Sequence, residues 1–164
     1  MLVEQVAAVY EPGKEVSLDE AMIPFKGRSS LKQYMPLKPV KCRKKVWARA
    51  DASNGYVSAF QVYTGKSGDT IEQALRARVV KDLTHDLKDT HRHIYFDNYF
   101  SSVDLLLDLF RNGLYGCGTL QNNRKGFPPQ LKTIAKKGLK ERGDSKTCQM
   151  SNLTVFVWQD NKPV

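Results

Sequence analysis

The chain has few cysteines, and no two of them stand at metal-binding spacing. Cys42, Cys117 and Cys148 are its only cysteines, and they lie far apart in the sequence. Structural zinc sites and disulfide frameworks need closely grouped or evenly paired cysteines. We therefore expect three free thiols, with neither a zinc knuckle nor a disulfide-stabilised domain.

Long apolar runs are also missing. The 164 residues suit one domain, and their composition, 41% hydrophobic and 26% charged, is ordinary for a globular protein. No segment approaches the about 20 apolar residues that a membrane-spanning helix needs. The first ten residues lack a basic flank and carry Glu4 within their apolar run, unlike a signal peptide. These absences predict an intracellular protein with no membrane role.

Acidic residues are absent from two stretches, residues 21–50 and 109–140, although the whole chain has a net charge of +9. Basic stretches of this kind suit a polyanionic partner such as DNA, while a solvated basic face is the plain alternative. Pro128, Pro129 and Gly138 interrupt the second stretch and predict a basic, loop-rich arm rather than a helix. The candidates for contacts with the DNA backbone are Lys26, Arg28, Lys38, Lys41, Lys44 and Lys45.

Alternating apolar residues predict a first strand from Val16 that bends or ends soon after Asp19, because Pro24 and Gly27 follow. Residues 29–41 read as an extended loop. Ser53-Asn54-Gly55 predicts a hairpin between strands over residues 45–51 and 56–64.

A helix with an apolar stripe follows this hairpin. Thr70 and Gln73 form its predicted capping box. The stripe comprises Ile71, Leu75, Val79, Leu83 and Leu87.

Beyond that helix we expect a strand over residues 93–100 and a second helix, capped by Ser101 with Asp104 and ended by Gly113. Shorter strands are predicted over residues 115–120 and 152–158. The helix between the hairpin and the strand at 93–100 allows the first strand and that strand to lie side by side and parallel, with a right-handed crossover.

Asp19 and Asp97 are the residues that this topology brings together. Each belongs to an alternating strand, and Asp97 lies at a strand's carboxyl end before a helix, a usual place for a site. Paired carboxylates could hold a divalent metal for phosphoryl transfer; turn carboxylates are the plain alternative. Glu20 faces the other way and is expected to be a structural residue or a salt-bridge partner. For Asn98, a ligand-orienting role and a capping role stay equally open.

Three blocks resemble the piggyBac family of DDE transposases: Ser17-Leu-Asp-Glu-Ala-Met-Ile-Pro-Phe-Lys-Gly-Arg28, Gln33-Tyr-Met-Pro-Leu-Lys-Pro39 with Lys41, and Phe96-Asp-Asn-Tyr-Phe-Ser-Ser102. They occur in the family's order and spacing, and the resemblance covers residues 10–120 well. It implies an α/β, RNase H-like mixed sheet of the order strand–strand–strand–helix–strand–helix–strand.

The resemblance further implies that Asp19 and Asp97 are the first two acidic ligands of a catalytic triad. The implied cofactor is Mg²⁺ or Mn²⁺, with two ions about 4 Å apart serving strand cleavage and transfer. The implied partner is double-stranded DNA at transposon ends, with a homodimer left open, and the implied location is the nucleus.

Three departures from the family limit these expectations. The third acidic residue is expected downstream of the strand that matches 153–158, where the last core helix should deliver it. We expect the sheet in this chain to be truncated before that helix, and Asp160 precedes the expected position. The family's cysteine-rich module is absent, and Arg43 stands where the family commonly has Gly. We therefore expect residues 1–15 to be a residual upstream segment, 16–120 the first part of the core and 121–164 an insertion-like segment with a further strand.

The function stays open between three readings. The first is a transposase core for cut-and-paste DNA transposition, incomplete in this chain and hence nearly inactive alone. The second is a domesticated or decayed transposase-derived protein that binds DNA without cutting it, and the third is an interaction module that keeps only the fold.

Overall fold

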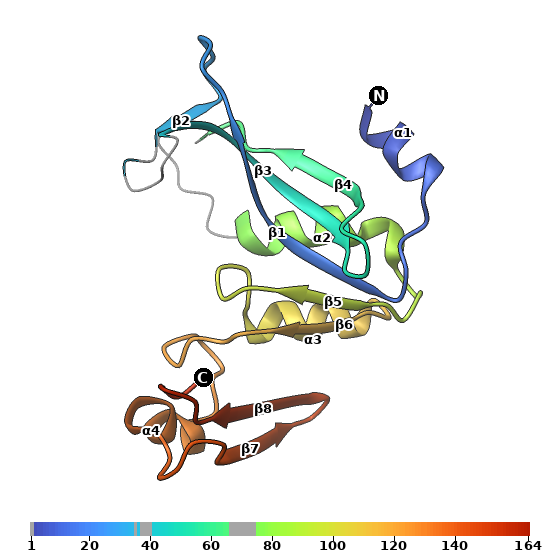
Figure 1. Ribbon diagram of the computed structural model, residues 1–164. Helices are drawn as coiled ribbons and strands as arrows, with labels where there is room; N and C mark the ends of the chain where they lie inside the picture. Colours follow the sequence, from blue (N-terminus) through green and yellow to red (C-terminus); the bar gives the residue numbers. More distant parts are fainter. Residues whose placement is uncertain (1, 35, 37–40, 66–74) are drawn as a thin grey trace.

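The computed structural model describes residues 2–34, 36, 41–65 and 75–164 (Figure 1). Its helices and strands follow one another along the chain in a fixed order. They are α1 (Leu2–Val9), β1 (Glu15–Pro24), β2 (Lys32–Tyr34), β3 (Cys42–Asp51), β4 (Val57–Val62), α2 (Leu75–Thr84), the short 3₁₀ helix η1 (His85–Leu87), β5 (His93–Phe96), α3 (Val103–Arg111), β6 (Tyr115–Gly118), α4 (Pro129–Lys137), β7 (Ser145–Met150) and β8 (Leu153–Trp158).

The main sheet is mixed, as the sequence predicted. Its strand order is β2-β3-β1-β5-β6, and β4 pairs with a further part of β3. β1 is antiparallel to β3 and parallel to β5, and β5 is parallel to β6. The strand that follows the hairpin and α2 therefore returns beside β1 and parallel to it, as predicted. Figure 1 shows β1 lying between the β3–β4 hairpin and β5.

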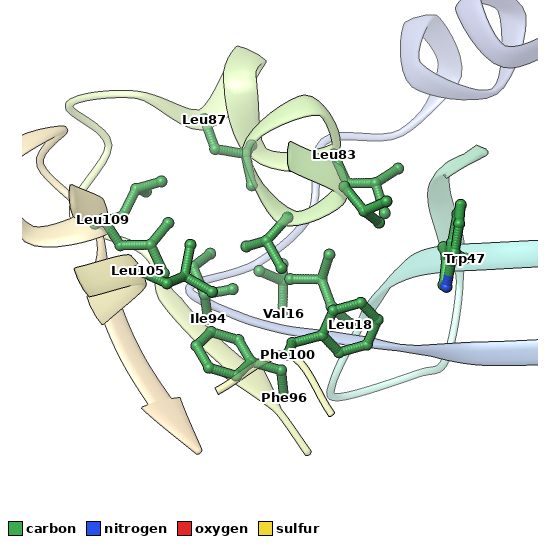
Figure 2. Close-up of a cluster of buried hydrophobic side chains, with 13 residues drawn as sticks. Val16, Leu18, Trp47, Leu83, Leu87, Ile94, Phe96, Phe100, Leu105 and Leu109 are labelled. Atoms are coloured by element: carbon green, nitrogen blue, oxygen red, sulfur yellow. The ribbon is translucent and has the colours of Figure 1, made fainter. Parts of the chain in front are cut away.

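The hydrophobic core joins the sheet to α2 and α3 (Figure 2). Val16, Leu18 and Ile94 of the central strands are at most 2% exposed. They pack with the predicted stripe of the crossover helix, of which Val79 and Leu83 are buried on α2, and with apolar residues of α3. Burying one such side chain contributes about 1.5–3 kcal/mol, so this cluster fixes β1 and β5 against the same helices.

Some predictions lie outside the described residues. They are Lys38, the Thr70 and Gln73 capping box and the first stripe residue, Ile71.

Two predictions about strands were wrong. β1 does not end soon after Asp19 but continues to Pro24, because Met22 and Ile23 still pair with Lys45 and Lys44 of β3. The stretch expected to be a loop contains β2, which pairs with the start of β3. In both cases the hydrogen bonds of a neighbouring strand outweigh local signals from proline and glycine.

Two predictions about helices also need correction. The cap of α3 is Ser102, whose side chain accepts a hydrogen bond from Leu105 N, rather than Ser101. The second basic stretch is not a loop-rich arm throughout, because it contains α4. Pro129 stands at the start of α4, where a missing N–H costs nothing, and buried Leu131 anchors the helix.

The C-terminal part forms a separate small sheet. β7 and β8 pair as an antiparallel hairpin outside the main sheet, and only β8 was predicted. Figure 1 shows this hairpin and α4 beyond the β6 side of the main sheet. A groove of about 730 Å³ lies between β6 and β8, lined among others by Cys117 and Val155. Among the described residues, no helix is long and apolar enough to cross a membrane.

Candidate metal centre

Asp19 and Asp97 emerge from neighbouring strands at matching positions. The parallel register of β1 and β5 ends with Leu18 opposite Phe96. Asp19 is the next residue of β1, and Asp97 is the first residue after β5, which is shorter than the predicted strand over residues 93–100. Leu18 and Phe96 are buried in the core, whereas both aspartates are exposed. Two residues that are far apart in the sequence thus present their carboxyl groups at one end of β5.

Each carboxylate is held by a backbone N–H close to it in sequence. Asp19 Oδ1 accepts a hydrogen bond from Glu20 N at 2.6 Å, and Asp97 Oδ1 accepts one from Tyr99 N at 2.9 Å. Throughout the part of the chain that the structure describes, neither Oδ2 atom accepts a hydrogen bond. Each aspartate therefore has one oriented oxygen and one oxygen open to a ligand.

The turn that carries Asp97 is fixed by further contacts. The Asp97 carbonyl accepts hydrogen bonds from Ser101 N at 3.3 Å and Ser101 Oγ at 2.9 Å. Arg124 Nη2 donates to the carbonyl of Asn98 at 3.1 Å. Asn98 itself is exposed and does not cap α3, since Ser102 does.

Gly118 of β6 leaves room for this turn. A Cβ at Gly118 would lie 2.6 Å from the Phe96 carbonyl oxygen and 2.5 Å from Ser101 Oγ, which is too close for any side chain. Glycine within a strand often marks such a close approach of another backbone. The sequence analysis did not identify Gly118 or Arg124, and it assigned Ser101 to the cap of the next helix rather than to this turn. A glycine within a predicted strand was the signal that could have pointed to Gly118.

The carboxylate pair fits one divalent cation that prefers oxygen ligands. Mg²⁺ takes carboxylate oxygens and keeps several waters, and both aspartates are exposed enough to leave space for these. Among residues 2–34, 36, 41–65 and 75–164, no three His, Cys, Asp or Glu side chains are grouped as a metal site. Asp160 pairs with Arg142 at 2.6 Å after β8, outside the sheet that carries the two aspartates.

His91 and His93 pack against aromatic side chains. His93 begins β5, a central strand, and its ring packs against Tyr95 and Tyr115. His91 precedes the strand and stacks on Tyr115. Both histidines belong to an aromatic cluster at the opposite end of β5 from Asp97.

The predicted DNA-binding residues differ in their exposure to solvent. Lys26, Arg28 and Lys41 are exposed, on the segments that flank the ends of β1 and β3. Lys44 is half-buried, and its Nζ lies 4.1 Å from the centroid of the Phe25 ring.

Lys45 differs, because the side chains of adjacent strand residues point to opposite faces. It shares the face of Trp47, is 16% exposed and pairs with Glu20, which confirms the expected salt-bridge role of Glu20.

Several known proteins are similar to this chain. A transposase family model, described as Transposase IS4, matches residues 1–164. Human PiggyBac transposable element-derived protein 3 is 34% identical over 155 residues, covering 90% of this chain, and human PiggyBac transposable element-derived protein 2 is 28% identical over the same length. The chain spans 26% of the length of each of these curated relatives.

A solved structure is similar over nearly the whole chain. It is the cryo-EM structure of a piggyBac transposase synaptic complex with hairpin DNA, with a TM-score of 0.84 and 26% sequence identity. The similarity covers 98% of this chain and 34% of that one. The mixed sheet and its helices therefore match the fold expected from the sequence.

Proposed function

This chain belongs to the piggyBac family of transposases, and we propose that it forms the part of a transposase core that supplies the first two acidic ligands for DNA strand cleavage and transfer. The observation that carries the proposal is the register of β1 and β5. It ends one residue before Asp19 and Asp97, the aspartates of two of the family's sequence blocks.

Asp19 and Asp97 would hold a divalent cation, Mg²⁺ or Mn²⁺, through the oxygens that face solvent. When bound between carboxylates, such a cation supplies charge stabilisation and an activated oxygen nucleophile for phosphoryl transfer. The N–H groups of Glu20 and Tyr99 orient the carboxylates from behind. Ser101 and Arg124 hold the Asp97 turn in place through hydrogen bonds to the carbonyls of Asp97 and Asn98.

Double-stranded DNA is the proposed partner, and the nucleus the proposed location. Lys26, Arg28 and Lys41 would neutralise backbone phosphates, with Lys44 contributing beside Phe25 and Lys38 belonging to the same acid-free stretch. The similar synaptic complex is with hairpin DNA, which supports DNA as the class of ligand. The alternative is a derivative that binds DNA without cutting it.

Paramagnetic NMR with Mn²⁺ tests the metal site directly. We expect Mn²⁺ to broaden amide signals around Asp19 and Asp97 in the wild-type chain, and the broadening to disappear in Asp19→Asn and Asp97→Asn. Asp160→Asn is the matched control, because it neutralises an aspartate that is paired with Arg142 outside the main sheet. Broadening that survives in both site variants would place the metal elsewhere and leave the DNA-binding alternative.

A further inference from the structure

Lys45 has an unusual environment for a lysine in a basic stretch. Its ammonium forms a salt bridge with Glu20, and its side chain is 16% exposed. Its Nζ lies 5.1 Å from the centroid of the Tyr99 ring, 5.6 Å from that of Trp47 and 5.9 Å from that of Tyr63. Such distances allow cation–π attraction, so the ammonium is held between a carboxylate and three aromatic rings.

Glu20 and Tyr99 are also the two residues whose backbone N–H groups hold the candidate metal ligands. Glu20 N donates to Asp19 Oδ1, and Tyr99 N donates to Asp97 Oδ1. Glu20 belongs to β1 and Tyr99 to the turn after β5, segments that only the fold brings together. One ammonium therefore contacts both residues that orient the carboxylates.

We propose that Lys45 is a positioning residue that fixes Asp19 and Asp97 relative to each other by holding Glu20 and Tyr99 from the core-facing side of the sheet. The inference rests on the proposed function of the two aspartates as metal ligands. Two neighbouring carboxylates repel each other. A side chain that already holds them close together lowers the free-energy cost of bringing them to one cation. Groups behind metal ligands commonly act in this way.

The side of the sheet separates this role from DNA binding. Lys44, the next residue, lies over Phe25, whereas Lys45 turns toward Trp47. Removing Lys45 should therefore change metal affinity, while leaving the affinity for duplex DNA in a chelating buffer unchanged. A lysine that contacts phosphates would give the reverse result.

Calorimetric titration of Mn²⁺ into the 164-residue chain tests the proposal. We expect Lys45→Met to weaken Mn²⁺ binding about 10-fold or more, the usual effect of removing a support behind metal ligands, and Lys45→Arg to restore most of it. Lys81→Met is the matched control, because Lys81 also forms a salt bridge, with Asp108 at 3.0 Å, but does so on the outer helices. Equal affinities for wild type and a folded Lys45→Met variant would overturn the proposal.

Amide hydrogen exchange gives a second measurement that needs no metal. In Lys45→Met, the amides of Glu20 and Tyr99 should exchange faster together, while those of the β7–β8 hairpin stay unchanged. Unchanged exchange at both amides would refute the positioning role even if Mn²⁺ did not bind the wild-type chain. If the wild-type chain did not bind Mn²⁺ but the two amides exchanged faster in the variant, the metal site would be refuted. The role of Lys45 in holding Glu20 and Tyr99 would then stand.

Discussion

Arg49 and Asp86 form a bidentate salt bridge that joins β3 to the short 3₁₀ helix η1 after the crossover helix α2. Arg49 Nη1 and Nη2 donate to the two Asp86 carboxylate oxygens at 2.5 and 2.9 Å. The guanidinium also donates to Ser58 Oγ and to the Leu83 carbonyl, and Arg49 is 1% exposed. Burial would raise the pKa of Asp86, but the hydrogen bonds and charge of Arg49 outweigh it and hold that pKa below its ordinary value.

Arg49→Met should therefore destabilise the fold by about 3 kcal/mol, because it leaves buried polar partners such as the Leu83 carbonyl without their donor. Urea unfolding followed by circular dichroism measures the change. Asp82→Asn is the control: it breaks an exposed pair with Arg78 one helical turn away, which is expected to cost at most about 0.5 kcal/mol. Equal losses of unfolding free energy in the two variants would contradict a structural role for the Arg49 guanidinium.

Asp51 should make the free energy of unfolding depend on pH in the acidic range. Its carboxylate accepts hydrogen bonds from Ser53 Oγ, Gly13 N, Ser53 N and the Tyr10 hydroxyl, and these hold the pKa of Asp51 well below its ordinary value of 3.8. Because the folded state favours the ionised form, this stabilisation is complete above pH 3.8 and is lost as the pH falls toward the folded-state pKa. The stability gap between wild type and Asp51→Asn should therefore be largest near neutral pH and shrink below pH 3.8, as thermal unfolding at several pH values would show.

Gly118→Ala should disturb the Asp97 turn. The added methyl group would meet the Phe96 carbonyl and Ser101 Oγ at impossible distances, so the turn must shift. We expect weaker Mn²⁺ binding, by about 10-fold, together with a lower melting temperature. Gly27→Ala is a suitable control, since the atoms nearest to its methyl group would be those of the half-buried Phe25 ring, a side chain that can move. Unchanged Mn²⁺ affinity in Gly118→Ala would mean that the turn adapts without moving Asp97.

Affinity for duplex DNA should fall with salt and with loss of the exposed basic residues. Lys41→Ala should weaken binding to all DNA sequences and reduce the slope of log affinity against log salt by about 1, as expected for one lost phosphate contact. Lys81→Ala, which removes the same charge from the outer surface of α2, should leave the slope unchanged. Identical slopes for the two variants would show that charge alone, and not the stretch around Lys41, governs binding.

Much of the candidate site could be predicted because it depends on the order of the strands and on the two-residue alternation of side chains along each strand. The order of hairpin, helix and strand allows β1 and β5 to pair in parallel, and alternation predicts that Asp19 faces away from Leu18. The same alternation places Lys44 and Lys45 on opposite faces of the sheet. Both were nevertheless predicted to bind DNA, because that prediction rested on charge alone. The sequence could not reveal how far β1 runs past Asp19, because that length depends on its pairing with β3.

The supports behind the aspartates were beyond sequence reasoning for a different reason. The salt bridge between Lys45 and Glu20 joins two strands, and the contact of Lys45 with Tyr99 joins a strand to a distant turn. Such contacts depend on side-chain directions in three dimensions. Neither composition nor spacing along the chain records them.

The pairing of β1 with β5 also bears on when the site forms during folding. β3 and β4 are joined by a short hairpin, whereas β1 meets β5 only after the hairpin and α2 have been placed between them. Closing so long a segment costs more entropy than closing a tight turn, and contacts of this kind tend to form late. The two aspartates should therefore become neighbours only near the end of folding, so that a partly folded chain with an intact hairpin would bind no metal.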